Sequence, residues 1–231
     1  MAGNPIDGFQ VNPADINYIG KDLQRPECIL AKRTGDLWAA DARGGVVKIA
    51  PDGRQDIITQ NFGETFSQAQ NAATQFTEGT LPNGLAFAKN GNIYISNFGT
   101  DVLEVMEPDG KTTLLYDEID GEPIGKVNFV LRDSKDRLWL TVSTRIKNWM
   151  EAISPNISDG FIAMADDKGL RIMTDGLSFT NEIRFDENED YLYIVETCGQ
   201  RISRMKVAED GTLSQREVFG PTQLGSGGFP D

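Results

Sequence analysis

Five oxygen-bearing side chains recur at one position of a repeated pattern: Glu27, Asn83, Asn128, Asn181 and Asp231. The first three stand 11 residues before an aromatic residue, Asn181 stands 12 before one, and Asp231 lies 50 residues beyond Asn181. Carboxylate and amide oxygens are the ligands of hard cations such as Ca²⁺ and Mg²⁺, and Zn²⁺ and Mn²⁺ accept them too. The pattern favours a divalent-metal site, because crowded buried acids are costly without a cation.

The alternative interpretation is structural. Asn and Asp after Pro are good turn residues, and a repeat protein can repeat a turn for packing alone. For Asn83 taken by itself this interpretation is the better one. The two acids in the same phase as the amides argue for the metal.

The aromatic markers of the repeat are Trp38, Tyr94, Trp139 and Tyr193, about fifty residues apart. Each is followed by a turn signal of the Pro-Asp-Gly kind, ending at Gly53, Gly110, Gly169 and Gly211. Such turns join the strands of tight hairpins. We expect the aromatic side chains to pack between sheets rather than to act in catalysis.

The second repeat shows the unit most clearly, as four short β-prone runs over 84–87, 93–97, 102–106 and 112–116. Four antiparallel strands per 40–50 residues are typical of a β-propeller blade. Short helical pieces are expected only near 66–76 and 145–153. The sequence therefore predicts one all-β propeller domain over residues 1–231.

The candidate residues precede the first strand of each repeat, and the first strand of a propeller blade lines the central channel. We therefore expect them to converge at one channel mouth. The segment 145–151 belongs to an insertion in the third repeat. A flap over the mouth that shapes a ligand pocket and a plain surface loop are equally good interpretations of it.

Composition narrows the chemistry. The 231 residues include no histidine, which excludes Ser-His-Asp and Cys-His catalysis and histidine-ligated zinc. A net charge of −13 disfavours nucleic acid and anionic membranes as partners. Cys28 and Cys198 are too few for a disulfide framework, and Cys28 is expected to be a small buried side chain. The absence of a leader sequence and of a membrane span predicts a cytoplasmic protein.

Several segments resemble the SMP-30/gluconolactonase/LRE family: 25–28, 138–141, 179–182 and 227–231. The resemblance implies a six-bladed propeller, of which about four and a half blades are present. It also implies one divalent ion held by Glu27, Asn181 and Asp231, with Ca²⁺ favoured and Zn²⁺, Mg²⁺ or Mn²⁺ as alternatives. Asn128, Asn83 and Lys126 would contact the substrate. Lys126 stands where some members have an arginine that grips sugar hydroxyls, so gluconolactone itself is not implied.

Together these features predict a metal-dependent hydrolase of a lactone or related ester, with Asp231 as general base and Asn128 assisting the carbonyl. Two alternatives remain. One is a metal-free enzyme similar to strictosidine synthase, and the other is a non-catalytic propeller that binds a metal or a partner.

The last residues suggest a further hypothesis. Four repeats end near Phe219 and Asp231 would open a fifth, so the domain is expected to be incomplete at its C-terminus. A companion polypeptide that begins with Gly is predicted to complete the ring. A truncated or split chain is the alternative.

Overall fold

The computed structural model describes residues 8, 10–61, 79–222, 224 and 230. They form an all-β structure dominated by four four-stranded antiparallel sheets, which confirms the predicted fold class. The short helix predicted near 66–76 lies outside the described residues. The one predicted near 145–153 is the 3₁₀ turn η3 (Trp149–Ala152).

Each sheet uses four consecutive strands in sequence order. Sheet 1 contains β1 (Glu27–Ala31), β2 (Leu37–Asp41), β3 (Gly45–Ile49) and β4 (Gln55–Thr59), and sheet 2 contains β5 (Pro82–Phe87), β6 (Ile93–Asn97), β7 (Val102–Met106) and β8 (Thr112–Tyr116). Sheet 3 contains β11 (Val127–Arg132), β12 (Leu138–Val142), β13 (Gly160–Asp166) and β14 (Gly169–Leu177), and sheet 4 contains β15 (Thr180–Phe185), β16 (Tyr191–Glu196), β17 (Arg201–Val207) and β18 (Leu213–Val218). The strands β9 (Glu118–Ile119) and β10 (Glu122–Pro123) form a small hairpin, and η1 (Pro13–Asp15) lies in the N-terminal arm.

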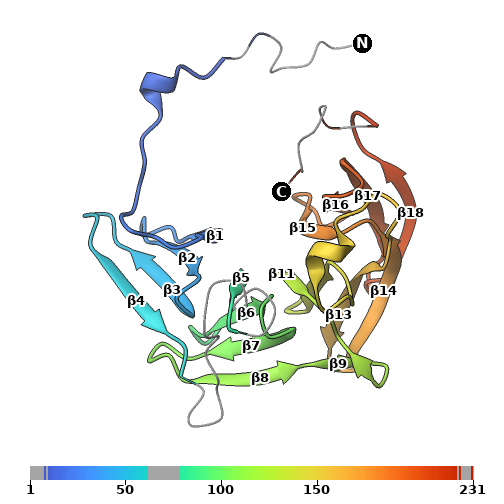
Figure 1. The fold of residues 1–231 in the computed structure, drawn as a ribbon, viewed down its shortest axis with the longest axis horizontal. Coiled ribbons are helices and arrows are strands. Elements are labelled where there is room, and N and C mark those ends of the chain that lie inside the picture. The colour runs from blue at the N-terminus through green and yellow to red at the C-terminus, as the bar shows by residue number, and fades with distance from the viewer. Residues whose placement is uncertain (1–7, 9, 62–78, 223, 225–229, 231) are drawn as a thin grey trace.

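The four sheets are arranged as an arc around a common centre, with β1, β5, β11 and β15 innermost (Figure 1). Contacts join β1 to β5, β5 to β11 and β11 to β15. The outer strands β4, β8 and β18 have no buried residue, whereas every residue of β12, the second strand of sheet 3, is buried. This gradient is what a radial stack of twisted sheets produces, because each sheet packs its inner part between its neighbours.

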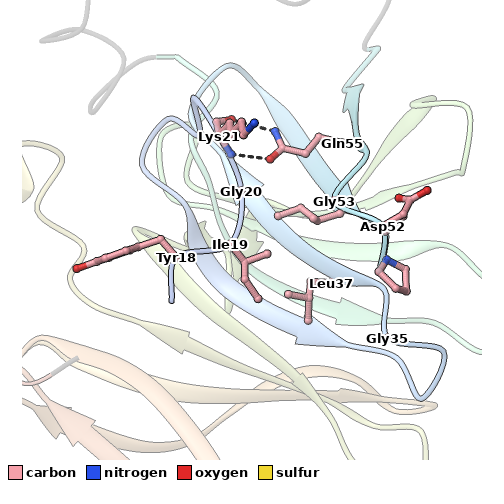
Figure 2. Close-up of a pocket in the computed structure, with 12 residues that line it drawn as sticks. Tyr18, Ile19, Gly20, Lys21, Gly35, Leu37, Asp52, Gly53 and Gln55 are labelled. Atoms are coloured by element: carbon pink, nitrogen blue, oxygen red, sulfur yellow. Dashed lines mark hydrogen bonds between the residues drawn. The ribbon is translucent and has the colours of Figure 1, made fainter. Parts of the chain in front are cut away.

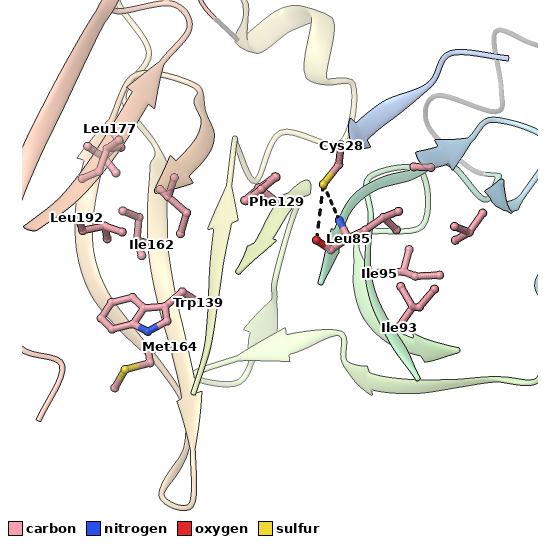
Figure 3. Close-up of a cluster of buried hydrophobic side chains, with 14 of the residues drawn as sticks. Cys28, Leu85, Ile93, Ile95, Phe129, Trp139, Ile162, Met164, Leu177 and Leu192 are labelled. Atoms are coloured by element: carbon pink, nitrogen blue, oxygen red, sulfur yellow. Dashed lines mark hydrogen bonds between the residues drawn. The ribbon is translucent and has the colours of Figure 1, made fainter. Parts of the chain in front are cut away.

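Aromatic and aliphatic side chains fill the spaces between the sheets (Figure 3). Trp38 meets Phe87 of sheet 2 edge-on at 6.0 Å between ring centroids, and Trp139 meets Phe185 of sheet 4 at 5.4 Å. Both markers therefore pack between sheets, as predicted from the sequence. Tyr193 packs instead on Phe219, which follows the outer strand of its own sheet.

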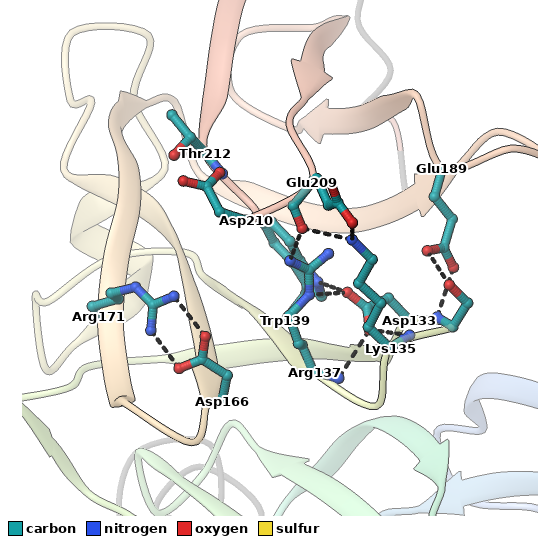
Figure 4. Close-up of polar contacts among 11 residues, drawn as sticks. Asp133, Lys135, Arg137, Trp139, Asp166, Arg171, Glu189, Glu209, Asp210 and Thr212 are labelled. Atoms are coloured by element: carbon teal, nitrogen blue, oxygen red, sulfur yellow. Dashed lines mark hydrogen bonds and ion pairs between the residues drawn. The ribbon is translucent and has the colours of Figure 1, made fainter.

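Polar contacts fasten sheet 3 to sheet 4 at the ends of the strands (Figure 4). The buried carboxylate of Asp133 accepts hydrogen bonds from Arg137 Nε at 2.6 Å and from Trp139 Nε1 at 2.9 Å. Arg137 also donates to the carbonyl oxygen of Glu209, at 3.0 Å, in the turn between β17 and β18. One buried acid thus orients the marker tryptophan and an arginine that reaches the next sheet.

Glycine is required at two kinds of place. The glycines of the four predicted turns all have positive φ between 83° and 93°, a conformation that side chains disfavour. At Gly84 a Cβ atom would lie 2.6 Å from the Cα of Phe129, so β5 and β11 approach each other closely there. That approach brings the inner strands of sheets 2 and 3 together beside the candidate residues.

Candidate functional site

The candidate residues stand at the start of the innermost strand in each sheet. Glu27 is the first residue of β1, and Asn83, Asn128 and Asn181 are each the second residue of β5, β11 and β15. The structure thus places these four at equivalent positions of neighbouring strands, as the repeat arithmetic predicted. Asp231, the predicted general base and third metal ligand, lies outside the described residues.

Every inner strand has a register shift at this position. The pairing with the second strand shifts between Glu27 and Ile29, between Pro82 and Leu85, between Val127 and Phe129, and between Thr180 and Ile183. Each shift inserts one extra residue, which leaves the ladder and redirects a side chain. Asn128 is the residue skipped in sheet 3, whereas in sheet 1 the skipped residue is Cys28, directly after Glu27, so the bulge lies at or beside the candidate residue.

The amides of sheets 2 and 3 meet directly. Asn83 Nδ2 donates to the side-chain oxygen and to the backbone oxygen of Asn128, at 3.0 Å in each case. Asn128 Nδ2 in turn donates to Ser143 Oγ at 3.0 Å. Both asparagines are buried, so this contact fixes two candidate side chains against each other across a sheet boundary.

In sheet 4, Asn181 Nδ2 donates to Thr197 Oγ1 at 3.0 Å. Thr197 Oγ1 donates to the carbonyl oxygen of Pro230 at 2.9 Å. Pro230 immediately precedes Asp231 in the sequence. The Asn181 side chain is therefore connected to the backbone next to the predicted base.

The donor set fits a hard divalent ion. Asn83 and Asn181 both use their side-chain nitrogens as donors, so it is their carbonyl oxygens that a cation would meet. Asn83 Oδ1 is buried and has no hydrogen-bond partner among the described residues. A buried carbonyl oxygen in that state is costly unless a cation or a ligand donor satisfies it. In the described part of the chain no group of three or more His, Cys, Asp or Glu residues is placed to hold a metal.

Glu27 is the least buried of the four candidate residues that the structure describes. Its side chain is 30% exposed, and Glu27 Oε1 lies 3.3 Å from Arg25 Nη2.

The following residue, Cys28, is the extra residue of the bulge, and burial raises the pKa of its thiol to about 11. Its Sγ accepts a hydrogen bond from the backbone nitrogen of Leu85 at 3.2 Å. Cys28 is therefore a buried packing residue, as expected.

Lys126, a predicted substrate contact, is a buried charged side chain. It is fully buried, and Nζ is 2.7 Å from Asp101 Oδ1 and 5.6 Å from the ring centre of Phe98. Burial raises the pKa of Asp101 even though the lysine opposes this shift. Because the ammonium is held in this ion pair, a contact between Lys126 and substrate stays a prediction that requires the pair to open.

The insertion in the third repeat covers the same end of the sheets. Its Trp149 packs against Phe98, which follows β6, at 5.7 Å, and against Phe179, which precedes β15, at 6.1 Å. Ala152 of η3 is buried in the same apolar cluster. The segment is thus packed over sheets 2 and 4, while its role in shaping a ligand pocket stays a prediction.

Sequence reasoning missed the side chains that hold the approach to each inner strand. Asp41 accepts from Gln24 N at 3.1 Å, Asn97 from Leu81 N at 2.8 Å, and Glu196 from Ser178 N at 3.1 Å. All three stand three residues after the marker aromatic. The repeats can be aligned on that aromatic residue. Comparing the residues after it, as well as those before it, would have revealed these three acceptors.

A separate pocket of about 410 Å³ lies at the other end of sheet 1 (Figure 2). It is an open pocket lined by the arm around Tyr18 and by the hairpin turns that contain Gly35 and Gly53. Lys21 in the arm exchanges two hydrogen bonds with Gln55, at 2.6 and 2.9 Å. None of the candidate residues lines this pocket, so it is not the site described above.

The fold is similar to solved structures of low sequence identity. A gluconolactonase from Xanthomonas campestris superimposes with a TM-score of 0.66 at 18% identity, covering 85% of this chain and 63% of that one. The calcium-binding protein regucalcin from Agrobacterium tumefaciens gives a TM-score of 0.62 at 16% identity, covering 86% and 60%. The chain therefore spans about three fifths of the length of these structures.

Sequence comparison adds one curated relative and one family. The Arabidopsis thaliana protein strictosidine synthase-like 2 is 28% identical over 160 residues, which are 65% of this chain and 42% of that protein. The SMP-30/gluconolactonase/LRE-like region matches residues 63–231. That match covers most of the chain and includes Asn83, Asn128 and Asn181. The protein therefore belongs to the SMP-30/gluconolactonase/LRE-like family.

Proposed function

We propose that the protein is a divalent-metal-dependent hydrolase that opens the ring of a lactone or cleaves a related ester. The observation that carries this proposal is the recurrence of oxygen donors at or beside the bulge that starts four neighbouring inner strands. Family membership and the gluconolactonase fold support the reaction class.

Glu27, Asn181 and Asp231 would hold the ion, with Ca²⁺ preferred because the donors are all oxygens. When bound, a divalent ion supplies Lewis acidity toward the lactone carbonyl and lowers the pKa of a nearby water. Asp231 would take the proton from the attacking water, since the chain has no histidine for that role. The second N–H of Asn128 Nδ2 would donate to the carbonyl oxygen as it gains charge.

Chelation tests the metal. Complete removal of divalent ions should abolish lactone hydrolysis and lower the melting temperature, because an ion bound to the native state stabilises it by about 3 kcal/mol at a hundredfold excess over Kd. Thermal unfolding with and without chelator, together with metal analysis of the purified protein, measures this. Equal melting temperatures at full depletion contradict a structural ion.

Two substitutions test the assignment of roles. Asp231→Ala should abolish turnover on a lactone panel, while Asn83→Ala should retain most of it. Steady-state kinetics of both variants, with folding checked by circular dichroism, make the comparison. Equal damage from the two substitutions would show that the roles are wrongly divided.

A metal-free enzyme similar to strictosidine synthase is the second candidate, and the match to strictosidine synthase-like 2 favours it. Activity that survives chelation would support this candidate. A folded protein that binds the ion but turns over no lactone or ester would instead indicate a non-catalytic propeller.

The completion of the ring by a second polypeptide and a cytoplasmic location both stay predictions. Among the described residues, no helix is long and apolar enough to cross a membrane. Intact mass spectrometry of the native protein tests the companion: a lone folded species of 25.4 kDa contradicts it.

A further inference from the structure

Two buried hydroxyl groups make the same pair of hydrogen bonds in sheets 3 and 4. Ser143 Oγ accepts from Asn128 Nδ2 at 3.0 Å and donates to the carbonyl oxygen of Thr180 at 2.7 Å. Thr197 Oγ1 accepts from Asn181 Nδ2 at 3.0 Å and donates to the carbonyl oxygen of Pro230 at 2.9 Å. Both hydroxyls stand four residues after the marker aromatic, directly after the second strand.

The direction of these bonds follows from the chemistry of the groups. A hydroxyl has one hydrogen, and a backbone carbonyl can only accept, so the hydrogen must lie between them. The hydroxyl oxygen can then only accept from the asparagine. The amide must therefore turn its nitrogen toward the hydroxyl and its oxygen to the other side of Cγ. A carbonyl in the neighbouring chain segment thus determines which atom of the asparagine faces the serine or threonine.

The other two sheets agree with this logic. The equivalent positions are Ala42 in sheet 1 and Phe98 in sheet 2, neither of which has a hydroxyl. In sheet 1 the candidate residue is Glu27, whose two carboxylate oxygens are equivalent and need no such orientation. In sheet 2 Asn83 is oriented directly by two hydrogen bonds to Asn128. The hydroxyl is present in sheets 3 and 4, where it accepts a hydrogen bond from the asparagine side chain.

We propose that Ser143 and Thr197 are positioning residues that fix the amide orientation of Asn128 and Asn181, so that Asn181 offers its oxygen to the divalent ion and Asn128 keeps its oxygen toward Asn83. This inference rests on the proposed function. It also explains how adjacent sheets are kept in register at the site, because Thr180 directly precedes Asn181 and Pro230 directly precedes Asp231.

Thr197→Val tests the orientation of Asn181, since valine keeps the shape and removes the hydroxyl. The variant is first stripped of metal with a chelator and then titrated with Ca²⁺ in a calorimeter. Its Kd should be about tenfold or more above that of the wild type, because losing the hydrogen-bond partner of a metal ligand typically weakens metal binding by that factor. Thr197→Ser should return the Kd to within about threefold of the wild type. A wild-type Kd for Thr197→Val would overturn the proposal.

Ser143→Ala should separate the two roles. Asn128 is not a proposed metal ligand, so the Kd for Ca²⁺ should stay near the wild-type value while kcat on a lactone falls. Thr141→Val is the matched control for the titration: Thr141 is fully buried and its hydroxyl accepts the backbone N–H of Phe129 at 3.0 Å. If Thr141→Val weakens Ca²⁺ binding as much as Thr197→Val, the effect is general loosening and the proposal fails.

A readout that needs no ion keeps the result separate from the proposed function. The side-chain NH₂ resonances of Asn181 in the metal-free protein should exchange slowly with water, and Thr197→Val should remove that protection. A wild-type protein that binds no divalent ion would refute the metal assignment, while these resonances still decide the orientation. Rapid exchange in the wild type would overturn the positioning role itself.

Discussion

In sheets 2 and 4 the segment before the inner strand donates a backbone N–H to a side chain three residues after the aromatic marker. The two sheets differ in whether the buried acid beside this hydrogen bond has a cationic partner. In sheet 4 the buried Glu196 accepts the backbone N–H of Ser178 and is bound by Arg201 through contacts of 2.7 and 2.9 Å. In sheet 2 the acceptor is the neutral Asn97, whose Nδ2 donates at 3.1 Å to Glu104, an acid in the next strand. Sheet 4 thus buries a charge with its counterion, whereas sheet 2 buries an acid among amides.

The pKa values of the two acids move in opposite directions. Burial raises the pKa of Glu196, but the hydrogen bonds from Arg201, Ser203 and Ser178 outweigh it and leave the pKa below its usual value. Burial raises the pKa of Glu104 to about 7, and the hydrogen bonds from Asn97 and Gln60 offset only part of this. A buried acid needs a cation, not only hydrogen bonds, to stay ionised cheaply.

The largest expected effect comes from breaking the sheet 4 arrangement. Glu196→Ala removes the acceptor of Ser178 and leaves Arg201 without its partner, so we expect the free energy of unfolding to fall by about 3 kcal/mol or more at pH 7. Urea unfolding of the wild type and of the variant measures this difference in free energy. A loss below about 1 kcal/mol would contradict the importance of the ion pair.

The second effect sharpens the contrast through pH. Because the folded pKa of Glu104 lies above its unfolded value near 4.5, its stabilising contribution is complete below that value and is lost as pH rises through about 7. Between pH 5 and pH 8 the wild type should lose about 2.5 kcal/mol relative to Glu104→Gln, whose single carbonyl oxygen can accept both existing bonds. Parallel pH profiles of unfolding for the two proteins would refute this.

The smallest effect belongs to sheet 1, which resembles sheet 4. Asp41 accepts from Gln24 N and pairs with Arg43 at 2.7 Å, and the bonds from Arg43 and Gln24 outweigh burial and lower its pKa. Its contribution is therefore present above the unfolded value and lost as pH falls below it. Asp41→Asn should lower the melting temperature by about 2–4 °C at neutral pH and by less at pH 3. An equal shift at both pH values would contradict an electrostatic origin.

The sequence predicted the repeating parts of the molecule well. All four strands of sheet 2 were located, with only the start of β5 displaced, because alternating apolar runs and glycine turns are local signals. The repeat spacing also predicted the candidate residues at the start of the inner strands, because each stands at a nearly constant distance before its aromatic marker: Glu27, Asn83, Asn128 and Asn181.

What the sequence did not reveal depends on contacts between repeats. The burial of Lys126 against Asp101 requires the loop after β6 to lie beside the start of β11, and no local pattern encodes that proximity. The bulges were missed because one extra residue in a short strand leaves the apolar pattern almost unchanged. The positions of Glu196 and Thr197 carried a signal, but it lay downstream of the aromatic marker rather than upstream.

The bulge at the start of each inner strand has a consequence for how such a protein can change its chemistry. Asn128 is skipped by the pairing between β11 and β12, so its identity is not constrained by the strand ladder. A substitution at Asn128 therefore leaves the strand pairing of sheet 3 intact, and its main cost is the loss of the hydrogen bonds to Asn83 and Ser143. Variation at this position, together with its hydrogen-bond partners, would change the ligands offered at the site while the strand pairing is kept.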